Sequence, residues 1–142
     1  MPQADPDNEA TFHTCVIDSR QAETEIPKRV IISELESCAF SPEDIFAVKL
    51  ALEEALTNAV RHGNAGDSSK RITVRYAVNE EKAVIVIRDE GNGFAPEEVP
   101  DPTAPERIPL PSGRGIMLMR TYMDEVSYRD GGREVRVVKR RA

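Results

Sequence analysis

Cysteine is scarce in this chain of 142 residues, and long apolar runs are absent from it. The two cysteines, Cys15 and Cys38, have neither CxxC nor metal-ligand spacing, so we expect small buried residues, with a disulfide or a reactive thiol as the alternative. No apolar stretch approaches the roughly 20 residues that span a membrane. The N-terminus MPQADPDNEA also lacks the charged-then-apolar order of a signal peptide. These absences predict a cytoplasmic protein that does not enter a membrane.

An excess of positive charge is missing as well, because the formal net charge is -6. Proteins that bind nucleic acid through its phosphates need basic surface, so direct nucleic-acid binding is not expected. The basic stretch 133–141 alternates in character like an edge strand and is interpreted as a solvated terminus. The length suits one domain with an adequate core. We therefore expect a polar leader over residues 1–9 and a single domain over residues 10–142.

The patterns of several nucleotide-binding folds are absent. No GxxxxGK[ST] motif occurs, and the glycines at 91 and 93 are not followed by the third glycine and the helix of a dinucleotide-binding fold. The HRD and DFG elements of the common protein kinases are missing too. A nucleotide site in this chain would therefore need a different architecture.

Hydrophobic periodicity and turn residues indicate an α+β protein. Ser41 and Pro42 predict the start of a long helix that Gly63 ends, and Pro27 suits the start of an earlier one. In that earlier helix, Val30, Ile31, Leu35 and Cys38 are expected to face inward. The predicted strands cover 11–17, 71–78, 82–89, 125–129 and 134–139, and the predicted helices cover 27–39, 42–62 and the stretch after the glycines at 113 and 115. Such an order predicts a two-layer sandwich, in which a mixed but mostly antiparallel sheet carries helices on one face.

The long helix changes character along its length. On a wheel of about 100° per residue, one arc carries an apolar core stripe of Ile45, Val48, Leu52, Ala55, Leu56 and Ala59. The opposite side is apolar at first, with Ala47, Leu50 and Ala51. It then presents Glu54, Asn58 and Arg61, which are surface neighbours because they lie four and three residues apart. This change predicts the wall of a polar pocket, and the alternative is a helix that simply emerges into solvent.

Two glycine-containing segments follow downstream. The β-branched run at 82–88 leads into Asp89-Glu90-Gly91-Asn92-Gly93-Phe94, where the glycines allow a close approach to a ligand and the aspartate can accept a hydrogen bond from an amino group. Later, Ser112-Gly113-Arg114-Gly115-Ile116 opens a helix, and a helix N-terminus offers free amides to an anion. Taken singly, an ordinary turn or a hinge would explain each of these segments.

Together and in this order, the three segments resemble the N, G1 and G2 boxes of the GHKL ATPases. EEALTNAVRHGN, RDEGNGF and GRGIMLMRTYMDEV look most like the boxes of the bacterial anti-sigma-factor serine/threonine kinases, and the resemblance covers about residues 10–139. It implies the GHKL (Bergerat) ATP-binding fold and the use of ATP with Mg²⁺. A histidine kinase fragment is the alternative within the superfamily, but His13 falls in a strand-like stretch.

The resemblance also implies roles for individual residues. Glu54 matches the general base and Asn58 the Mg²⁺ ligand, whereas Glu53 points about 100° away and is expected to be a solvated or capping neighbour. Arg61 matches a phosphate-contacting position, with an ordinary surface arginine as the alternative. Asp89 is implied as the acceptor for the adenine amino group. The implied glycine-box contacts are Gly91 and Gly93 at the pocket floor, and Gly113, Arg114 and Gly115 at the phosphates.

Between the glycine boxes lies a proline-rich stretch, with Pro96, Pro100, Pro102, Pro105, Pro109 and Pro111. Regular structure is not expected there. By position it corresponds to the family's ATP lid, about residues 94–113, and a plain surface loop is the alternative. The implied function is phosphorylation of a small anti-sigma-factor antagonist protein and sequestration of a sigma factor by a homodimer. The alternative is an ATP-dependent interaction switch without transfer activity, acting on another regulator such as a phosphatase.

Overall fold

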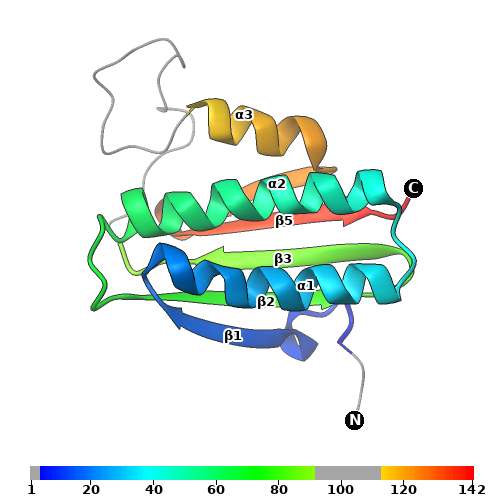
Figure 1. Ribbon diagram of the computed structural model, residues 1–142, viewed down its shortest axis with the longest axis horizontal. Helices are drawn as coiled ribbons and strands as arrows, with labels where there is room; N and C mark the ends of the chain where they lie inside the picture. The colour runs from blue at the N-terminus through cyan, green and yellow to red at the C-terminus, as the bar shows by residue number, and fades with distance from the viewer. Residues whose placement is uncertain (1–3, 92–112) are drawn as a thin grey trace.

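The computed structural model describes residues 4–91 and 113–142 (Figure 1). A five-stranded sheet has the order β1-β2-β3-β5-β4, and each neighbouring pair is antiparallel. Its strands are β1 (His13–Asp18), β2 (Arg71–Val78), β3 (Lys82–Arg88), β4 (Glu125–Arg129) and β5 (Glu134–Arg140). The helices α1 (Glu25–Ser37), α2 (Pro42–Asn58) and α3 (Gly113–Tyr122) form the second layer in front of it. The predicted α+β sandwich is confirmed, although the described sheet is antiparallel throughout rather than mixed.

The α2 helix begins and packs as its sequence predicts. The Ser41 hydroxyl accepts a hydrogen bond from the Asp44 amide at 3.1 Å, and Pro42 occupies the first turn, where a helix needs no internal amide donor. Of the predicted core stripe, Val48, Leu52 and Leu56 are fully buried, Ala55 and Ala59 are buried, and Ile45 is partly buried. After Asn58 the chain makes a π-helical turn, Ala59–Gly63, so the regular α-helix ends earlier than predicted.

The α1 helix departs from the prediction at one side chain and at its start. Ile31 and Leu35 are fully buried, but Val30 is 42% exposed, so the expectation that it faces inward is wrong. The helix begins two residues before Pro27, which is tolerated because the first amides of a helix have no intrahelical acceptor. Cys15 and Cys38 are free and partly buried, and burial raises the pKa of both thiols.

The β5 strand is an interior strand, not the edge strand that its alternating sequence suggested. It pairs with β3 on one side and β4 on the other, so β1 and β4 form the edges of the described sheet. The alternation reflects burial: Val135 and Val137 face the helices, whereas Glu134 and Arg136 join ion pairs. An interior strand with one polar face therefore has the same sequence pattern as an edge strand.

Both faces of the central strand β3 are covered. Ala83, Ile85 and Ile87 belong to the core under the helices. Val84 and Val86 belong to a second apolar cluster, which Ala4 and Phe12 join. Part of the predicted polar leader therefore covers apolar residues of the sheet, and the boundary at residue 10 stays a prediction. None of the described helices is long and apolar enough to cross a membrane.

Candidate functional site

The polar end of α2 lies against the start of α3. A Cβ atom at position 115 would lie 2.4 Å from Oε2 of Glu54 and 3.7 Å from Nδ2 of Asn58. Gly115 is buried, and both polar side chains are half-buried. Because real Cβ atoms essentially never approach another heavy atom within 3 Å, the Glu54 carboxylate lies in space that a side chain at position 115 would need. Two segments about 60 positions apart thus meet at one carboxylate.

The end of the α2 segment lies against the exit of β3. A Cβ atom at Gly63 would stand 2.2 Å from Oδ2 of Asp89, and one at Gly91 would stand 1.6 Å from the carbonyl oxygen of Gly63. Side chains at either position would collide with backbone or with the Asp89 carboxylate. Gly63, which the sequence indicates only as a helix stop, is therefore required for close packing against Asp89.

Asp89 is a partly buried carboxylate. Burial raises its pKa above the usual value, while a hydrogen bond from the Gly91 amide and the positive charge of Arg133 lower it. The Gly91 amide donates to Oδ1 at 2.8 Å. The carboxylate is thus a hydrogen-bond acceptor at the inner end of a tight turn.

Two further residues hold this turn, and neither was predicted from the sequence. Asn64 is fully buried; its Oδ1 accepts the Glu90 amide at 2.8 Å and its Nδ2 donates to the Arg71 carbonyl at 3.1 Å. Arg133 donates from Nε to the Gly91 carbonyl at 2.8 Å. The sequence signal for Asn64 is its place at the end of the EEALTNAVRHGN box, directly after Gly63, and the sequence carries no signal for Arg133.

The other predicted site residues lie farther from these contacts or outside the described residues. Arg61 is exposed in the π-helical turn. Gly113 and Arg114 begin α3, whereas Gly93 and most of the predicted lid lie outside the described residues. Glu53 is exposed and pairs with Lys28 of α1, which agrees with its predicted place away from the pocket.

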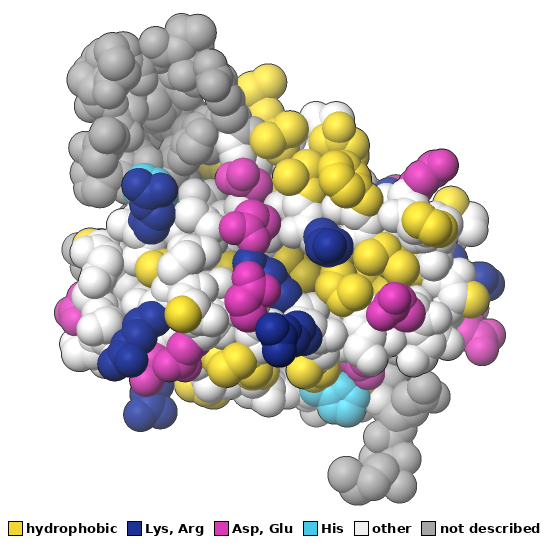
Figure 2. Space-filling model, viewed as in Figure 1, with side chains coloured by type: hydrophobic (Ala, Val, Ile, Leu, Met, Phe, Trp, Pro, Cys, Tyr) yellow, Lys and Arg dark blue, Asp and Glu magenta, His cyan; other side chains and the backbone are white. Residues whose placement is uncertain are grey.

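The surface beside this polar region is apolar. Figure 2 shows hydrophobic side chains gathered over α3 and the neighbouring part of α2. The exposed members are Met117, Leu118 and Tyr122 of α3 and Phe46 of α2, and the rings of Phe46 and Tyr122 meet edge to face at 6.2 Å. Exposed apolar patches often mark contacts with other macromolecules.

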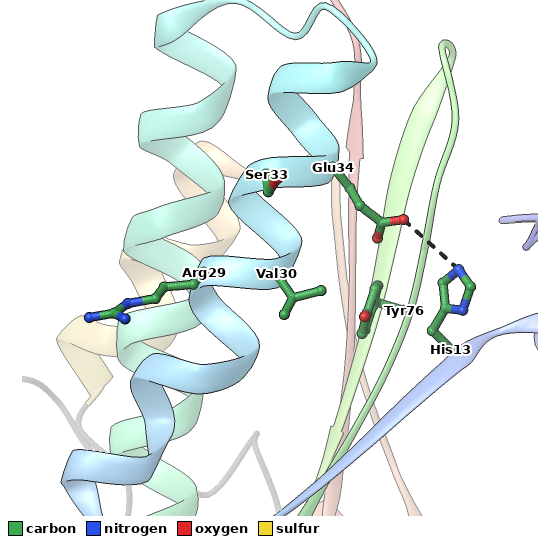
Figure 3. A pocket seen from close by; sticks show the side chains of 6 residues that line it. All are labelled: His13, Arg29, Val30, Ser33, Glu34 and Tyr76. Carbon is green, nitrogen blue, oxygen red and sulfur yellow. Dashed lines mark ion pairs between the residues drawn. The ribbon is translucent and has the colours of Figure 1, made fainter.

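A separate pocket of about 480 Å³ opens between α1 and the β1–β2 edge of the sheet (Figure 3). His13 and Glu34 lie 3.9 Å apart there, and burial raises the pKa of Glu34 while His13 opposes that shift. The other lining residues are Arg29, Val30, Ser33 and Tyr76. None of the predicted site residues lines this pocket, so the candidate site is the junction of α2, α3 and the β3 exit.

Comparisons with known proteins identify the family of the chain. The model of the histidine kinase-like ATPase domain family matches residues 8–139. A serine-protein kinase RsbW of Listeria monocytogenes is 35% identical over 122 residues, which are 78% of this chain and 76% of that protein. A serine-protein kinase RsbW of Bacillus licheniformis is 35% identical over 107 residues, covering 70% of this chain and 67% of that protein.

Solved structures share the fold at low sequence identity. The crystal structure of the RsbU and RsbW domains of a Mycobacterium tuberculosis protein has a TM-score of 0.59 and 17% identity, covering 90% of this chain and 32% of that one. A mycobacterial sensor histidine kinase, MprB, has a TM-score of 0.50 and 18% identity over 90% of this chain and 97% of that one. These two structures share the fold, and the family match and the relatives show that the chain belongs to the histidine kinase-like ATPase family, in the group of the RsbW serine-protein kinases.

Proposed function

We propose that this protein is a Mg-ATP-dependent serine/threonine protein kinase of the anti-sigma-factor type. It would phosphorylate a small antagonist protein and, as a homodimer, sequester a sigma factor when that antagonist is not available. The observation that carries the proposal is the meeting of Glu54 and Asn58 with Gly115, because it joins a carboxylate and a carboxamide to the start of a helix. The named relatives and the family match support the same activity.

The adenine ring would be recognised at Asp89. Its carboxylate accepts a hydrogen bond from the Gly91 amide and lies in the space that a side chain at position 63 would occupy. An exocyclic amino group is a donor that matches such an acceptor. Gly91 and Gly93 would form the floor beneath the ring.

The phosphates would lie between α2 and the start of α3. The backbone amides of Gly113, Arg114 and Gly115 lie in the first turn of α3, where the helix dipole stabilises an anion. Arg61, exposed at the end of the α2 segment, would supply positive charge to the same phosphates.

The metal would be held by Asn58. Among the described residues no group of three or more His, Cys, Asp or Glu side chains could hold a metal ion. A single carboxamide fits Mg²⁺, which keeps several waters and takes its other ligands from nucleotide phosphates. When bound, the ion neutralises charge on the phosphates.

Glu54 would act as the general base. It would take the proton of the acceptor hydroxyl as that oxygen forms a bond to the γ-phosphorus and the bond to ADP breaks. The alternative, a nucleotide-dependent switch without transfer, needs Asn58 and Asp89 but no base. The presence of Glu54 therefore favours the kinase, and the apolar surface that begins at Met117 favours a protein as the acceptor.

The proposal is tested by capturing partners from a lysate of the source cells with and without ADP or ATP, and then following label transfer. Proteins that bind in a nucleotide-dependent way are identified by mass spectrometry and incubated with the protein and γ-labelled ATP. We expect label on a serine or threonine of one small captured protein. Nucleotide-dependent capture with no label on any partner would support the switch instead.

A preference for adenine nucleotides is the second expected result. ADP should bind far better than GDP, because guanine presents a carbonyl where adenine presents the amino group that Asp89 accepts. Isothermal titration calorimetry with the two diphosphates measures the ratio. Equal affinities would contradict the role of Asp89, whatever the transfer activity.

A further inference from the structure

The turn that carries Asp89 is held at consecutive backbone groups by residues distant in sequence. The Asp89 amide donates to the Arg133 carbonyl at 2.9 Å, and the Glu90 amide donates to Asn64 Oδ1 at 2.8 Å. The Gly91 carbonyl accepts from Arg133 Nε at 2.8 Å. Three successive residues of the turn are thus fixed from two sides, by the end of the α2 segment and by the start of β5.

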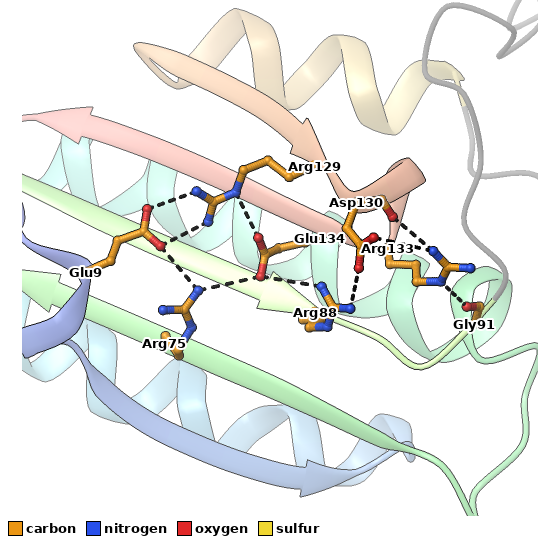
Figure 4. A network of polar contacts seen from close by, with 8 residues as sticks. All are labelled: Glu9, Arg75, Arg88, Gly91, Arg129, Asp130, Arg133 and Glu134. Carbon is orange, nitrogen blue, oxygen red and sulfur yellow. Dashed lines mark hydrogen bonds and ion pairs between the residues drawn. The ribbon is translucent and has the colours of Figure 1, made fainter.

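Arg133 is itself oriented by the turn between β4 and β5. Its Nη1 donates to the Asp130 carbonyl at 3.3 Å and lies 3.6 Å from the carboxylate of the same residue. Asp130 in turn pairs with Arg88 of β3 (Figure 4). Asp130, Gly131 and Gly132 all have left-handed φ values of 52°, 64° and 87°, which allow the chain to reverse tightly just before Arg133. The contacts with Asp130 therefore orient the Arg133 guanidinium toward the Gly91 carbonyl.

Asn64 is suited to hold the other side of the turn. Its carboxamide is fully buried and bridges the Glu90 amide to the Arg71 carbonyl at the start of β2. Truncation would remove the partner of both backbone groups, whose hydrogen bonds to Asn64 are partly buried.

We propose that Asn64 and Arg133 are positioning residues that set the direction of the Asp89 carboxylate and thereby the discrimination between adenine and guanine. The inference rests on the proposed function, because it assigns Asp89 to the adenine amino group. A hydrogen bond discriminates between bases only if its acceptor is held in place, and Asp89 adjoins a turn with no spare volume at Gly63 or Gly91. The positive charge of Arg133 also lowers the pKa of Asp89, against the effect of burial.

The test compares ADP and GDP binding by calorimetry for the wild-type chain, Arg133→Ala, Arg133→Lys and Arg75→Ala. Arg133→Ala should lose about tenfold or more in ADP affinity, the usual worth of a charge-assisted hydrogen bond, while GDP affinity changes less. The ADP:GDP ratio should therefore fall. Arg133→Lys retains the charge and a donor and should recover part of the ratio.

Arg75→Ala is the matched control. Arg75 lies 3.2 Å from Glu9 and 3.6 Å from Glu134 in the same ion-pair network, and these two ion pairs do not involve the described residues 89–91 of the turn (Figure 4). Its removal should leave the ADP:GDP ratio unchanged. A thermal melt of each apo variant shows whether it is folded, and Arg133, whose side chain is 37% exposed, can be truncated without opening the core.

The two proposals fail in different ways. A wild-type chain that binds ADP and GDP equally would overturn the assignment of Asp89. A selective wild-type chain whose Arg133→Ala variant keeps the full ratio would leave that assignment intact and overturn the role of Arg133. Asn64→Asp keeps the acceptor for Glu90 and should keep more of the ratio than Asn64→Ala; an equal loss in both would overturn the role of Asn64.

Discussion

Replacing Glu54 by alanine should lower phosphate transfer by roughly two to four orders of magnitude while nucleotide binding survives. A positioned general base contributes about that factor. The Asn58 carboxamide and the Asp89 carboxylate remain in Glu54→Ala, so the contacts assigned to metal and adenine are kept. The measurement is the single-turnover rate of label transfer from γ-labelled ATP to the captured partner, with a calorimetric binding isotherm for the same variant.

Glu53→Ala is the matched control for this prediction. It removes the adjacent carboxylate on the same helix, but Glu53 is exposed and pairs with Lys28 rather than facing Gly115. Transfer by Glu53→Ala should stay near the wild-type rate. A Glu54→Ala protein that transfers phosphate as fast as the wild type would remove Glu54 from the mechanism.

Asn58→Ala should weaken Mg²⁺-dependent ATP binding by at least about tenfold and abolish the activities that depend on it. Even the loss of an outer partner of a metal ligand costs 10- to 100-fold in many sites, so the loss of the ligand itself should cost no less. Affinity is measured with Mg²⁺ and with excess EDTA. The wild type should bind ATP more tightly with Mg²⁺, and Asn58→Ala should show little difference between the two conditions.

Thr57→Ala controls for truncation at the neighbouring position. Thr57 is also half-buried, but its hydroxyl accepts a hydrogen bond from Gln21 at 3.3 Å. The Thr57→Ala variant should show the same increase in ATP affinity with Mg²⁺ as the wild type. If Asn58→Ala responds to Mg²⁺ as strongly as the wild type does, the metal ligand must be sought elsewhere.

Local patterns predicted much of the architecture. The bounds of β2 and β4 agree with the structure, because a run of alternating or β-branched residues specifies a strand without reference to its neighbours. The cap at Ser41 and the core stripe of α2 are equally local. The position of β5 within the sheet is not specified by local sequence, because an interior strand with one polar face and an edge strand have the same alternation.

The sequence by itself determined most of the secondary structure, the family and the identity of the polar residues at the end of α2. Each depends on short-range spacing, which is present in the chain before it folds. Only the tertiary structure decided that Gly115 packs against Glu54 and Gly63 against Asp89. It also decided that Asn64 and Arg133 hold the turn at residues 89–91 by hydrogen bonds. These contacts join residues from different elements, and their distances depend on how the helices and strands pack, which no local pattern encodes.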